Sequence, residues 1–299
     1  MKLSDPIYWS MTSLIREASQ TAMDKRADRE VSDVVQGKTL DDAHSEAIRD
    51  YPVFEQFILQ VALEFSHRLG LGWGSKAVDL GSGTGVGACI LSKLPFMHHV
   101  YAVEYSEHFV QKIMPLVFER FGAQTEKIQR VVGDFNHQEL EDRSLDLILE
   151  IEAFHHSENL EFTVQECERV LKPGGVMLVI DRAWPDHYTS EQLEAMLDKE
   201  FSAQLKTKYG IPAESSFTRR DFGEHEYTVQ QCIIAFRRKG FAVTVFQHWH
   251  PPFLNRWWLK LPILKATVFL DAILYKLGFR RLRVYGFSNT RVLFLCIKQ

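Results

Sequence analysis

Cysteine is scarce in this sequence, and no two cysteines form a Cys-x-x-Cys pair. The four cysteines lie far apart, each inside an apolar segment: Cys89, Cys167, Cys232 and Cys296. This spacing favours buried, reduced thiols over a disulfide framework or a cysteine metal site. It indicates a cytoplasmic protein.

Long uninterrupted apolar runs are also missing. Residues 1–6 are polar and no apolar leader follows them, so no secretory signal is predicted and a cytoplasmic location is expected. The apolar stretch 263–277 is interrupted by Lys265, Asp271 and Lys276, which argues against a membrane-spanning helix.

Internal repeats and low-complexity tracts are absent as well. Of the 299 residues, 45% are apolar and 25% are charged, which suffices to build a core without disulfides or metals. This length favours one α/β core with additions over two equal domains. We expect a helical N-terminal extension or cap over 1–60 and a main domain over 61–299, with a lid-like insertion over 183–228 and an aromatic, basic insertion over 249–288.

Short apolar segments alternate regularly with helical ones in the middle of the chain. Strands are predicted at 77–80, 100–104, 128–132, 145–150 and 176–180, and helices at 86–94, 106–121 and 160–171. This alternation predicts a parallel sheet with helices on both faces, which binds ligands at the carboxyl ends of its strands. Two further strands are expected at 241–247 and 292–297.

A glycine-rich loop follows the first of these strands, from Asp79 to Gly85. Gly81, Gly83 and Gly85 allow the backbone to turn sharply and to approach a ligand closely. Dinucleotide-binding proteins share such loops, so the loop by itself does not identify the ligand. Asp79 can hold a ligand ammonium group or orient the loop, and it would repel a pyrophosphate.

The next two strands end in further acidic residues. Glu104 can accept hydrogen bonds from ribose hydroxyls, and Asp134 can accept from an adenine amine while Phe135 or Tyr105 covers the ring. Residues 169–175 then read as a helix stop that leads into a strand.

In this order, these features resemble the class I S-adenosylmethionine-dependent methyltransferase family, in its small-molecule branch with the ubiquinone, tocopherol and sterol enzymes. The resemblance covers roughly residues 75–182. It implies a seven-stranded Rossmann-like sheet with an antiparallel hairpin from the last two strands, and S-adenosyl-L-methionine as cofactor. The residues implied to bind the cofactor are Asp79, Gly81, Ser82, Gly83, Gly85, Glu104, Tyr105, Gly133, Asp134, Phe135 and Glu150.

Residues 150–156 lie where this family places its methyl-transfer pocket, and the Ile-Glu-Ala element there resembles the sterol methyltransferases. Methyl transfer to a hydroxyl requires positioning and a general base, a task that suits histidine. We therefore predict His155 or His156 as the base, with Glu152 orienting the histidine or the substrate. Asp181 and His225 are weaker candidates for substrate contact.

No metal site is predicted. His248 and His250 lie close in sequence but lack a matching acidic or cysteine partner.

The C-terminal part is unusually basic. Eight basic residues and a single acid lie between Arg256 and Arg291, although the whole chain has a net charge of −4. The stretch 251–290 is expected to contact a membrane surface peripherally, to form a flap over the active site, or to bind an anionic substrate through Arg280, Arg281 and Arg283. Nucleic acid is disfavoured, because the chain is acidic and lacks the Asn/Asp-Pro-Pro-Tyr/Phe element of base-methylating enzymes.

The sequence therefore predicts a methyltransferase that acts on a small-molecule acceptor, at an oxygen of a sugar, a secondary metabolite or an isoprenoid or lipid-like substrate. One alternative is C- or N-methylation of a lipid-like substrate at the membrane surface. Others are a nicotinamide-dependent oxidoreductase of similar fold and a catalytically silent module that binds a partner through 251–290.

Overall fold

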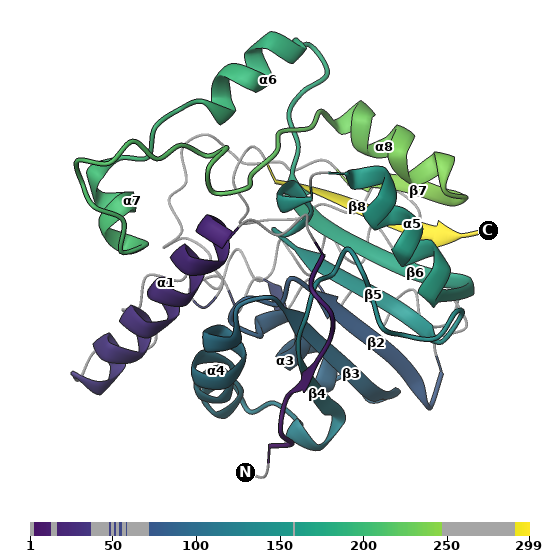
Figure 1. Cartoon of the computed structure of the whole chain (residues 1–299). Coiled ribbons are helices and arrows are strands. Elements are labelled where there is room, and N and C mark those ends of the chain that lie inside the picture. The colour runs from purple at the N-terminus through teal and green to yellow at the C-terminus, as the bar shows by residue number, and fades with distance from the viewer. Residues whose placement is uncertain are drawn as a thin grey trace, which may run out of the picture.

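The computed structural model describes residues 3–12, 17–36, 48, 51, 54–55, 58, 72–157, 159–246 and 291–299. Within these residues eight strands form one sheet, in the order β1-β4-β3-β2-β5-β6-β8-β7 (Figure 1). Its parallel centre consists of β2 (Ser75–Leu80), β3 (Met97–Glu104), β4 (Ile128–Val132), β5 (Leu145–Ile151) and β6 (Leu171–Arg182). Each of these strands overlaps one expected from the sequence.

The strand order reverses at β2. This strand pairs in parallel with β3 on one side and with β5 on the other. The loops that leave β2 and β5 therefore diverge at the carboxyl edge of the sheet, where such folds bind their ligands.

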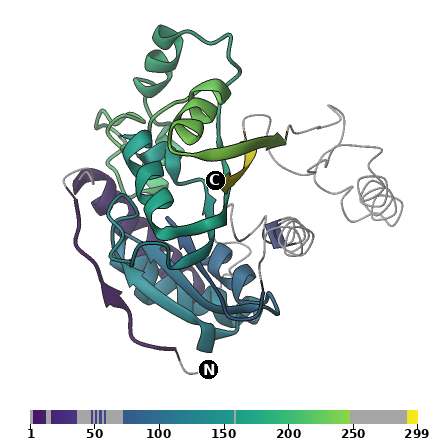
Figure 2. The same ribbon diagram turned by 90° about the vertical axis from the view of Figure 1, so that its right-hand side faces the viewer.

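The last two strands form the antiparallel part of the sheet. β8 (Arg291–Lys298) lies between β6 and β7 (Phe241–Phe246) and is antiparallel to both. Figure 2 shows β7 in green beside β8 in yellow. The hairpin implied by the family resemblance is thus confirmed, whereas the aromatic and basic insertion over 249–288 lies outside the described residues.

The expected count of seven strands was one too low. The additional strand is β1 (Ile7–Tyr8), which pairs in parallel with β4 at the edge of the sheet. Trp9 continues this pairing by donating its backbone N–H to the Val132 carbonyl at 2.9 Å. A two-residue strand held by backbone hydrogen bonds has no room for an alternating side-chain pattern, so its sequence carries no strand signal.

Helices cover both faces of the sheet, as predicted. One face carries α3 (Val86–Ser92), the π-helix η1 (Phe109–Ile113) and α4 (Met114–Phe121), and the other carries α5 (Leu160–Val170) and α8 (Val229–Arg238) (Figure 1). Alternate residues of β2 point to opposite sides, because a strand has a period of two. Ala77 packs with the first helical layer, while Val78 and Leu80 pack with the second.

A third layer covers the carboxyl edge of the sheet. It is made of α1 (Glu17–Val35), α6 (Ser190–Leu197) and α7 (Ala203–Lys208) (Figure 1). A small apolar cluster joins Ala22 of α1 to Phe201, Tyr209 and Phe222 of the segment after β6. Two short 3-10 turns, η2 (Thr125–Lys127) and η3 (Phe154–His156), complete the described elements.

All four cysteines are buried free thiols, as the sequence predicts. Of the helices that the structure describes, none combines the length and apolar character needed to cross a membrane.

Candidate active site

A cavity of about 350 Å³ lies at the carboxyl ends of β2, β3, β5 and β6. The glycine loop and Glu104 form one side of it, and residues of α1, α7 and the segment after β6 form the other. The predicted residues Asp79, Gly81, Ser82, Gly83, Glu104, Tyr105, Phe135, Glu152, His155 and His156 all line this cavity. The topology thus brings most of the candidate site together.

The glycine loop is shaped by close packing. Gly81 has a φ of +62°, and a Cβ atom there would lie 2.3 Å from the Cβ of Ala153. Only glycine combines this left-handed backbone with such a close approach. The turn after β2 is therefore pressed directly against the turn after β5.

Asp79 orients the helix that follows the loop. Its Oδ2 accepts the Ala88 backbone N–H at 2.7 Å, and a Cβ at Gly87 would lie 2.4 Å from its Oδ1. Burial raises the pKa of Asp79 to about 7, against the opposing effect of the hydrogen bonds from Ala88 and Ser82. Asp79 thus holds the first turn of α3 and also lines the cavity, while its predicted contact with a ligand ammonium group stays a prediction.

Glu104 ties the glycine loop to β3. Its Oε2 accepts the Gly83 N–H at 2.9 Å and its Oε1 accepts the Ser106 N–H at 3.0 Å. Burial raises the pKa of this carboxyl group, and the backbone hydrogen bonds oppose that shift. Carboxylate oxygens have further lone pairs, so Glu104 retains the capacity to accept from ribose hydroxyls.

Asp134 does not line the cavity. Its Oδ1 accepts the Asn136 backbone N–H at 2.8 Å, and its Oδ2 accepts the backbone N–H of Thr12 at 3.2 Å and also the Thr12 hydroxyl. The preceding Gly133 packs against Trp9, whose Cβ would lie 2.8 Å from an added Cβ. Thr12 of the N-terminal segment thus already donates to the Asp134 carboxylate. The predicted contact between Asp134 and adenine stays a prediction.

Two other predicted residues are also held away from the cavity. Gly85 caps α3 and faces Phe118. Glu150 is fully buried; its Oε1 accepts backbone N–H groups of Ala153 and Phe154, the latter at 3.0 Å. Burial raises the pKa of Glu150 well above its ordinary value. Both residues shape the turns around the cavity.

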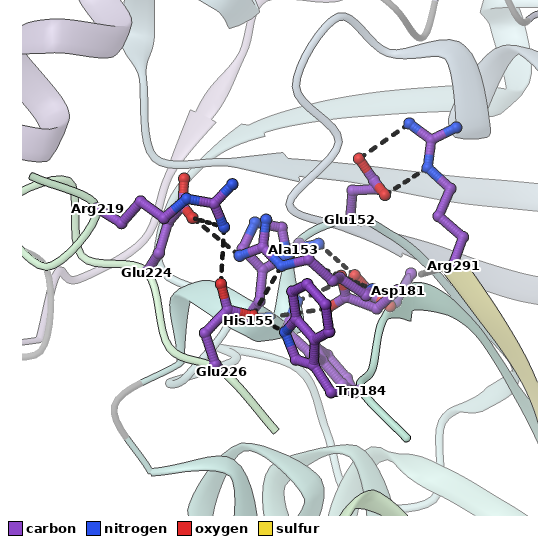
Figure 3. Close-up of polar contacts among 12 residues, drawn as sticks. Glu152, Ala153, His155, Asp181, Trp184, Arg219, Glu224, Glu226 and Arg291 are labelled. Atoms are coloured by element: carbon purple, nitrogen blue, oxygen red, sulfur yellow. Dashed lines mark hydrogen bonds and ion pairs between the residues drawn. The ribbon is translucent and has the colours of Figure 1, made fainter. Parts of the chain in front are cut away.

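His155 is fixed by the carboxylate of Asp181 at the end of β6 (Figure 3). Its Nδ1 lies 2.7 Å from Asp181 Oδ1, and its backbone N–H donates to Oδ2 at 2.8 Å. Burial opposes protonation of the ring, but the charge of Asp181 outweighs it and raises the pKa of His155. The backbone N–H of His225 donates to the His155 carbonyl at 2.5 Å, so the segment after β6 also touches this turn.

His156 lies beside His155, with ring centroids 4.4 Å apart, and is a different kind of histidine. Burial and the neighbouring His155 lower the pKa of His156 to about 3. It is therefore neutral near pH 7. Among the described residues its buried Nδ1 meets no hydrogen-bond partner.

Glu152 forms a bidentate ion pair with Arg291 at the start of β8 (Figure 3). Nε donates to Oε1 at 2.5 Å and a terminal nitrogen donates to Oε2 at 3.1 Å. Glu152 also has a φ of +57°, a strained conformation for a non-glycine residue. The carboxylate thus lines the cavity as half of an ion pair with a residue that sequence reasoning did not select.

An ionic network behind His155 was also missed. Arg182 donates to Glu224 at 2.8 Å and to Glu226 at 2.9 Å, and Glu226 accepts from Trp184 at 2.6 Å and from Arg219 at 2.7 Å (Figure 3). Apart from Arg182, which ends β6, these residues come from an irregular polar stretch without periodicity. The only sequence signal was the run of opposite charges between 219 and 226.

The donor set suits the implied cofactor. Glu104 offers acceptors for a ribose, while Thr84 lines the cavity with a buried hydroxyl that no described residue satisfies. The Phe135 side chain and Tyr105 also line the cavity, where an adenine ring requires apolar cover. The residues present therefore fit S-adenosyl-L-methionine.

Comparisons with known proteins agree with this geometry. A family model described as a methyltransferase domain matches residues 78–179. The sterol 24-C-methyltransferase ERG6B of Gibberella zeae is 32% identical over 141 residues, which is 47% of this chain and 36% of that protein. Malonyl-[acyl-carrier protein] O-methyltransferase 1 of Coxiella burnetii is 50% identical over 48 residues, 16% of this chain and 17% of that one. The match to the sterol enzyme thus spans about a third of its length.

A solved structure shares the fold over nearly the whole chain. It is described as a sarcosine dimethylglycine methyltransferase from Galdieria sulphuraria, with 18% identity and a TM-score of 0.54, and the match covers 91% of this chain and 96% of that one. At this identity the similarity concerns the fold. Residues 78–179 thus match a methyltransferase domain, and the family model, the sterol enzyme and the shared fold together support a class I S-adenosylmethionine-dependent methyltransferase.

Proposed function

We propose that this protein transfers a methyl group from S-adenosyl-L-methionine to an oxygen of a small-molecule acceptor, with His155 as the general base. The observation that carries this proposal is the His155–Asp181 pair in the cavity that the glycine loop also lines. Sugars, secondary metabolites and isoprenoid or lipid-like alcohols are the acceptor classes that fit.

When bound, S-adenosyl-L-methionine supplies a methyl group activated by its sulfonium. The chain has to place the acceptor oxygen and remove its proton. With Nδ1 of His155 held by Asp181, Nε2 is the ring nitrogen that accepts the proton. Asp181 stabilises the imidazolium that results, because the two charges are 2.7 Å apart in a buried setting.

His156 serves a different purpose in this proposal. With a pKa of about 3 it is a weak base, so it acts as a neutral hydrogen-bonding group toward the acceptor. Glu152 is held by Arg291 and shapes the cavity wall rather than exchanging a proton. This division of roles reduces the three catalytic candidates to one base.

Carbon methylation is the second candidate function. It is favoured by the similarity to a sterol 24-C-methyltransferase over 141 residues, and by the Ile-Glu-Ala element at 151–153, which resembles that of the sterol methyltransferases. The apolar residues Phe109, Leu205 and Phe222 in the cavity also suit an isoprenoid acceptor. An alkene carbon, unlike a hydroxyl, requires no base before methyl transfer.

The first test is calorimetric titration with S-adenosylmethionine, S-adenosylhomocysteine and NADH, on wild type and Glu104→Ala. Micromolar binding of the adenosyl ligands that is lost in the variant supports the proposal. Binding of NADH alone would refute it. A screen with methyl-labelled cofactor against sugars, phenols, prenols and sterols then identifies the acceptor, and the carbon shift of the labelled methyl group distinguishes O-methyl from C-methyl products.

Several predictions from the sequence accompany this proposal. We also propose a boundary between an N-terminal cap over 1–60 and a main domain over 61–299. The segment 183–228 is proposed to act as a lid, and the protein is proposed to be cytoplasmic. A peripheral membrane contact through 251–290 also stays a prediction, since that stretch lies outside the described residues.

A further inference from the structure

One face of α1 contacts the residues that directly follow Glu104. The Gln20 side chain donates to the Tyr105 carbonyl at 3.4 Å. Asp24 Oδ1 accepts from the Ser106 hydroxyl at 2.5 Å. Gln20 and Asp24 are four residues apart, so they lie on the same side of the helix. The helix is therefore anchored beside the carboxylate that is predicted to hold the cofactor ribose.

Ser106 joins Asp24 to Glu104. It is fully buried, and its hydroxyl oxygen accepts the Phe109 backbone N–H at 3.4 Å while the hydroxyl donates to Asp24. The backbone N–H of Ser106 donates to Glu104 Oε1 at 3.0 Å. The other carboxylate oxygen of Glu104 accepts from Gly83. A continuous series of hydrogen bonds thus leads from α1 through Ser106 and Glu104 to the glycine loop.

The same helix forms part of the cavity wall. Met23 and Arg26 line the cavity, whereas Asp24 does not. The Arg26 guanidinium carbon lies 5.6 Å from the centroid of the Phe109 ring and 5.7 Å from that of the Tyr209 ring, so α1 packs against elements on both sides of the cavity. Any effect of Asp24 on a ligand therefore has to be indirect.

We propose that Asp24 is a positioning residue for the cofactor: by holding Ser106, it fixes the Glu104 carboxylate in the orientation that accepts from the ribose. The inference rests on the proposed function, because it takes S-adenosyl-L-methionine as the ligand of Glu104. A carboxylate that is already oriented loses less freedom when the ribose binds, and this preorganisation favours affinity. The N-terminal helix then contributes to cofactor affinity without touching the cofactor.

The experiment is calorimetric titration of wild type, Asp24→Ala and Asp24→Asn with S-adenosylhomocysteine. Both substitutions remove the same negative charge, which adds to the larger effect of burial in raising the pKa of Glu104. Only alanine also removes the acceptor of the Ser106 hydroxyl. Asp24→Ala should weaken binding about tenfold, the effect of one hydrogen bond to a charged group. Asp24→Asn should stay within about twofold of wild type, because its amide oxygen still accepts.

Asp28→Ala is the matched control. Asp28 lies one turn further along α1, and its Oδ1 is 2.5 Å from Lys112 Nζ and 3.0 Å from His108 Nδ1. Its substitution removes a carboxylate from the same helix but leaves the Asp24–Ser106 contact in place. The affinity for S-adenosylhomocysteine should therefore equal that of wild type.

A double-variant cycle separates positioning from a general loss of structure. Ser106→Ala removes the hydroxyl from the other side of the same contact and should weaken binding by a similar factor. The double variant Asp24→Ala/Ser106→Ala should then bind no more weakly than the weaker of the two single variants, because both substitutions break one interaction. Ser106→Ala also keeps the test valid if Asp24→Ala does not fold.

Four results would overturn the inference. These are an unchanged affinity in Asp24→Ala or, where that variant does not fold, in Ser106→Ala; an equal loss in Asp28→Ala; an equal loss in Asp24→Asn; and losses that add in the double variant. If wild type itself fails to bind S-adenosylhomocysteine, the proposed function is wrong, so the two failures are distinguishable.

Discussion

The acidic side chains on the two sides of the cavity are held by different kinds of donor. On the glycine-loop side, the carboxylates of Asp79 and Glu104 accept from backbone N–H groups of Ala88, Gly83 and Ser106. On the opposite side, charged side chains bind one another, as Arg182 binds Glu224 and Glu226. Backbone donors are fixed by the fold, whereas side-chain pairs can be exchanged for other pairs.

This difference has a consequence for specificity. A side fixed by backbone geometry suits a ligand that is the same in every member of the family. A side made of side-chain pairs can be rebuilt for a new acceptor without disturbing the sheet, because its charges lie on the covering layer. The His155–Asp181 pair stands between the two, since it joins the turn after β5 to the end of β6.

The largest effect is expected at that junction. His155→Gln should lower the turnover of the acceptor found by the screen by about 10²–10⁴, the usual contribution of a general base. The affinity for S-adenosylhomocysteine should stay unchanged, because it depends on the glycine-loop side of the cavity, where backbone N–H groups donate to Asp79 and Glu104.

His156→Gln is the matched control for this prediction. Because His156 is already neutral, its loss should cost less than His155→Gln in the same turnover assay. If the two variants lose equal activity, or if His156→Gln loses more, the assignment of the base to His155 is wrong.

The side of the cavity opposite the glycine loop, which is held together by ion pairs between side chains, can be tested through Glu226. This buried carboxylate accepts from Arg182, Trp184 and Arg219, and Glu226→Gln removes its charge, so that Glu224 alone must balance the two guanidinium groups. The free energy of unfolding from urea titration should fall by about 3 kcal/mol, as for a broken buried ion pair. Glu161→Gln, which breaks an exposed pair with Arg238, should cost less than about 1 kcal/mol. A similar loss of unfolding free energy in both variants would show that the Glu226 network stabilises the fold no more than an exposed ion pair does.

The glycine-loop side of the cavity can be tested through Gly81. Gly81→Ala combines a left-handed φ with a contact at 2.3 Å to Ala153, and should lower the free energy of unfolding by about 3 kcal/mol. Gly174→Ala also has a positive φ, +76°, but an added Cβ would meet nothing within 4 Å. It should cost only the backbone strain of about 1–2 kcal/mol. Equal costs would mean that the close packing of the two turns is not needed.

A further test of the glycine-loop side concerns the pH dependence of stability. The pKa of Asp79 is raised in the folded protein from an ordinary 3.8 to about 7, so the folded state binds its proton more tightly than the unfolded chain does. Its contribution is fully present below pH 4 and is lost as the pH rises toward 7. The stability of wild type relative to Asp79→Asn, in which the amide oxygen still accepts from Ala88, should therefore decline across this range in chemical denaturation. A constant difference would contradict the raised pKa.

The parallel strands, the glycine loop and the segment after β5 were all readable from the sequence, because each depends on a local pattern. The parallel strands β2 to β6, of five to twelve residues, alternate with helices, and Gly81 and Glu104 directly follow or end a strand. Asp134 was placed correctly after β4, yet its neighbour Thr12 comes from the N-terminal segment that follows β1, and no sequence pattern predicted that contact. Correct identification of a residue thus did not determine what it binds.

The sequence by itself determined the seven strands β2 to β8, the helices on both faces and the glycine loop, since strand and turn propensities act between near neighbours. Only the tertiary structure decided the partners on the acceptor side. Glu152 and Arg291 are separated by 139 residues, and Arg182 and Glu226 by 44. A charge attracts any opposite charge that the fold brings near it, so the sequence shows that the charges exist but the packing of the covering layer selects the pairs.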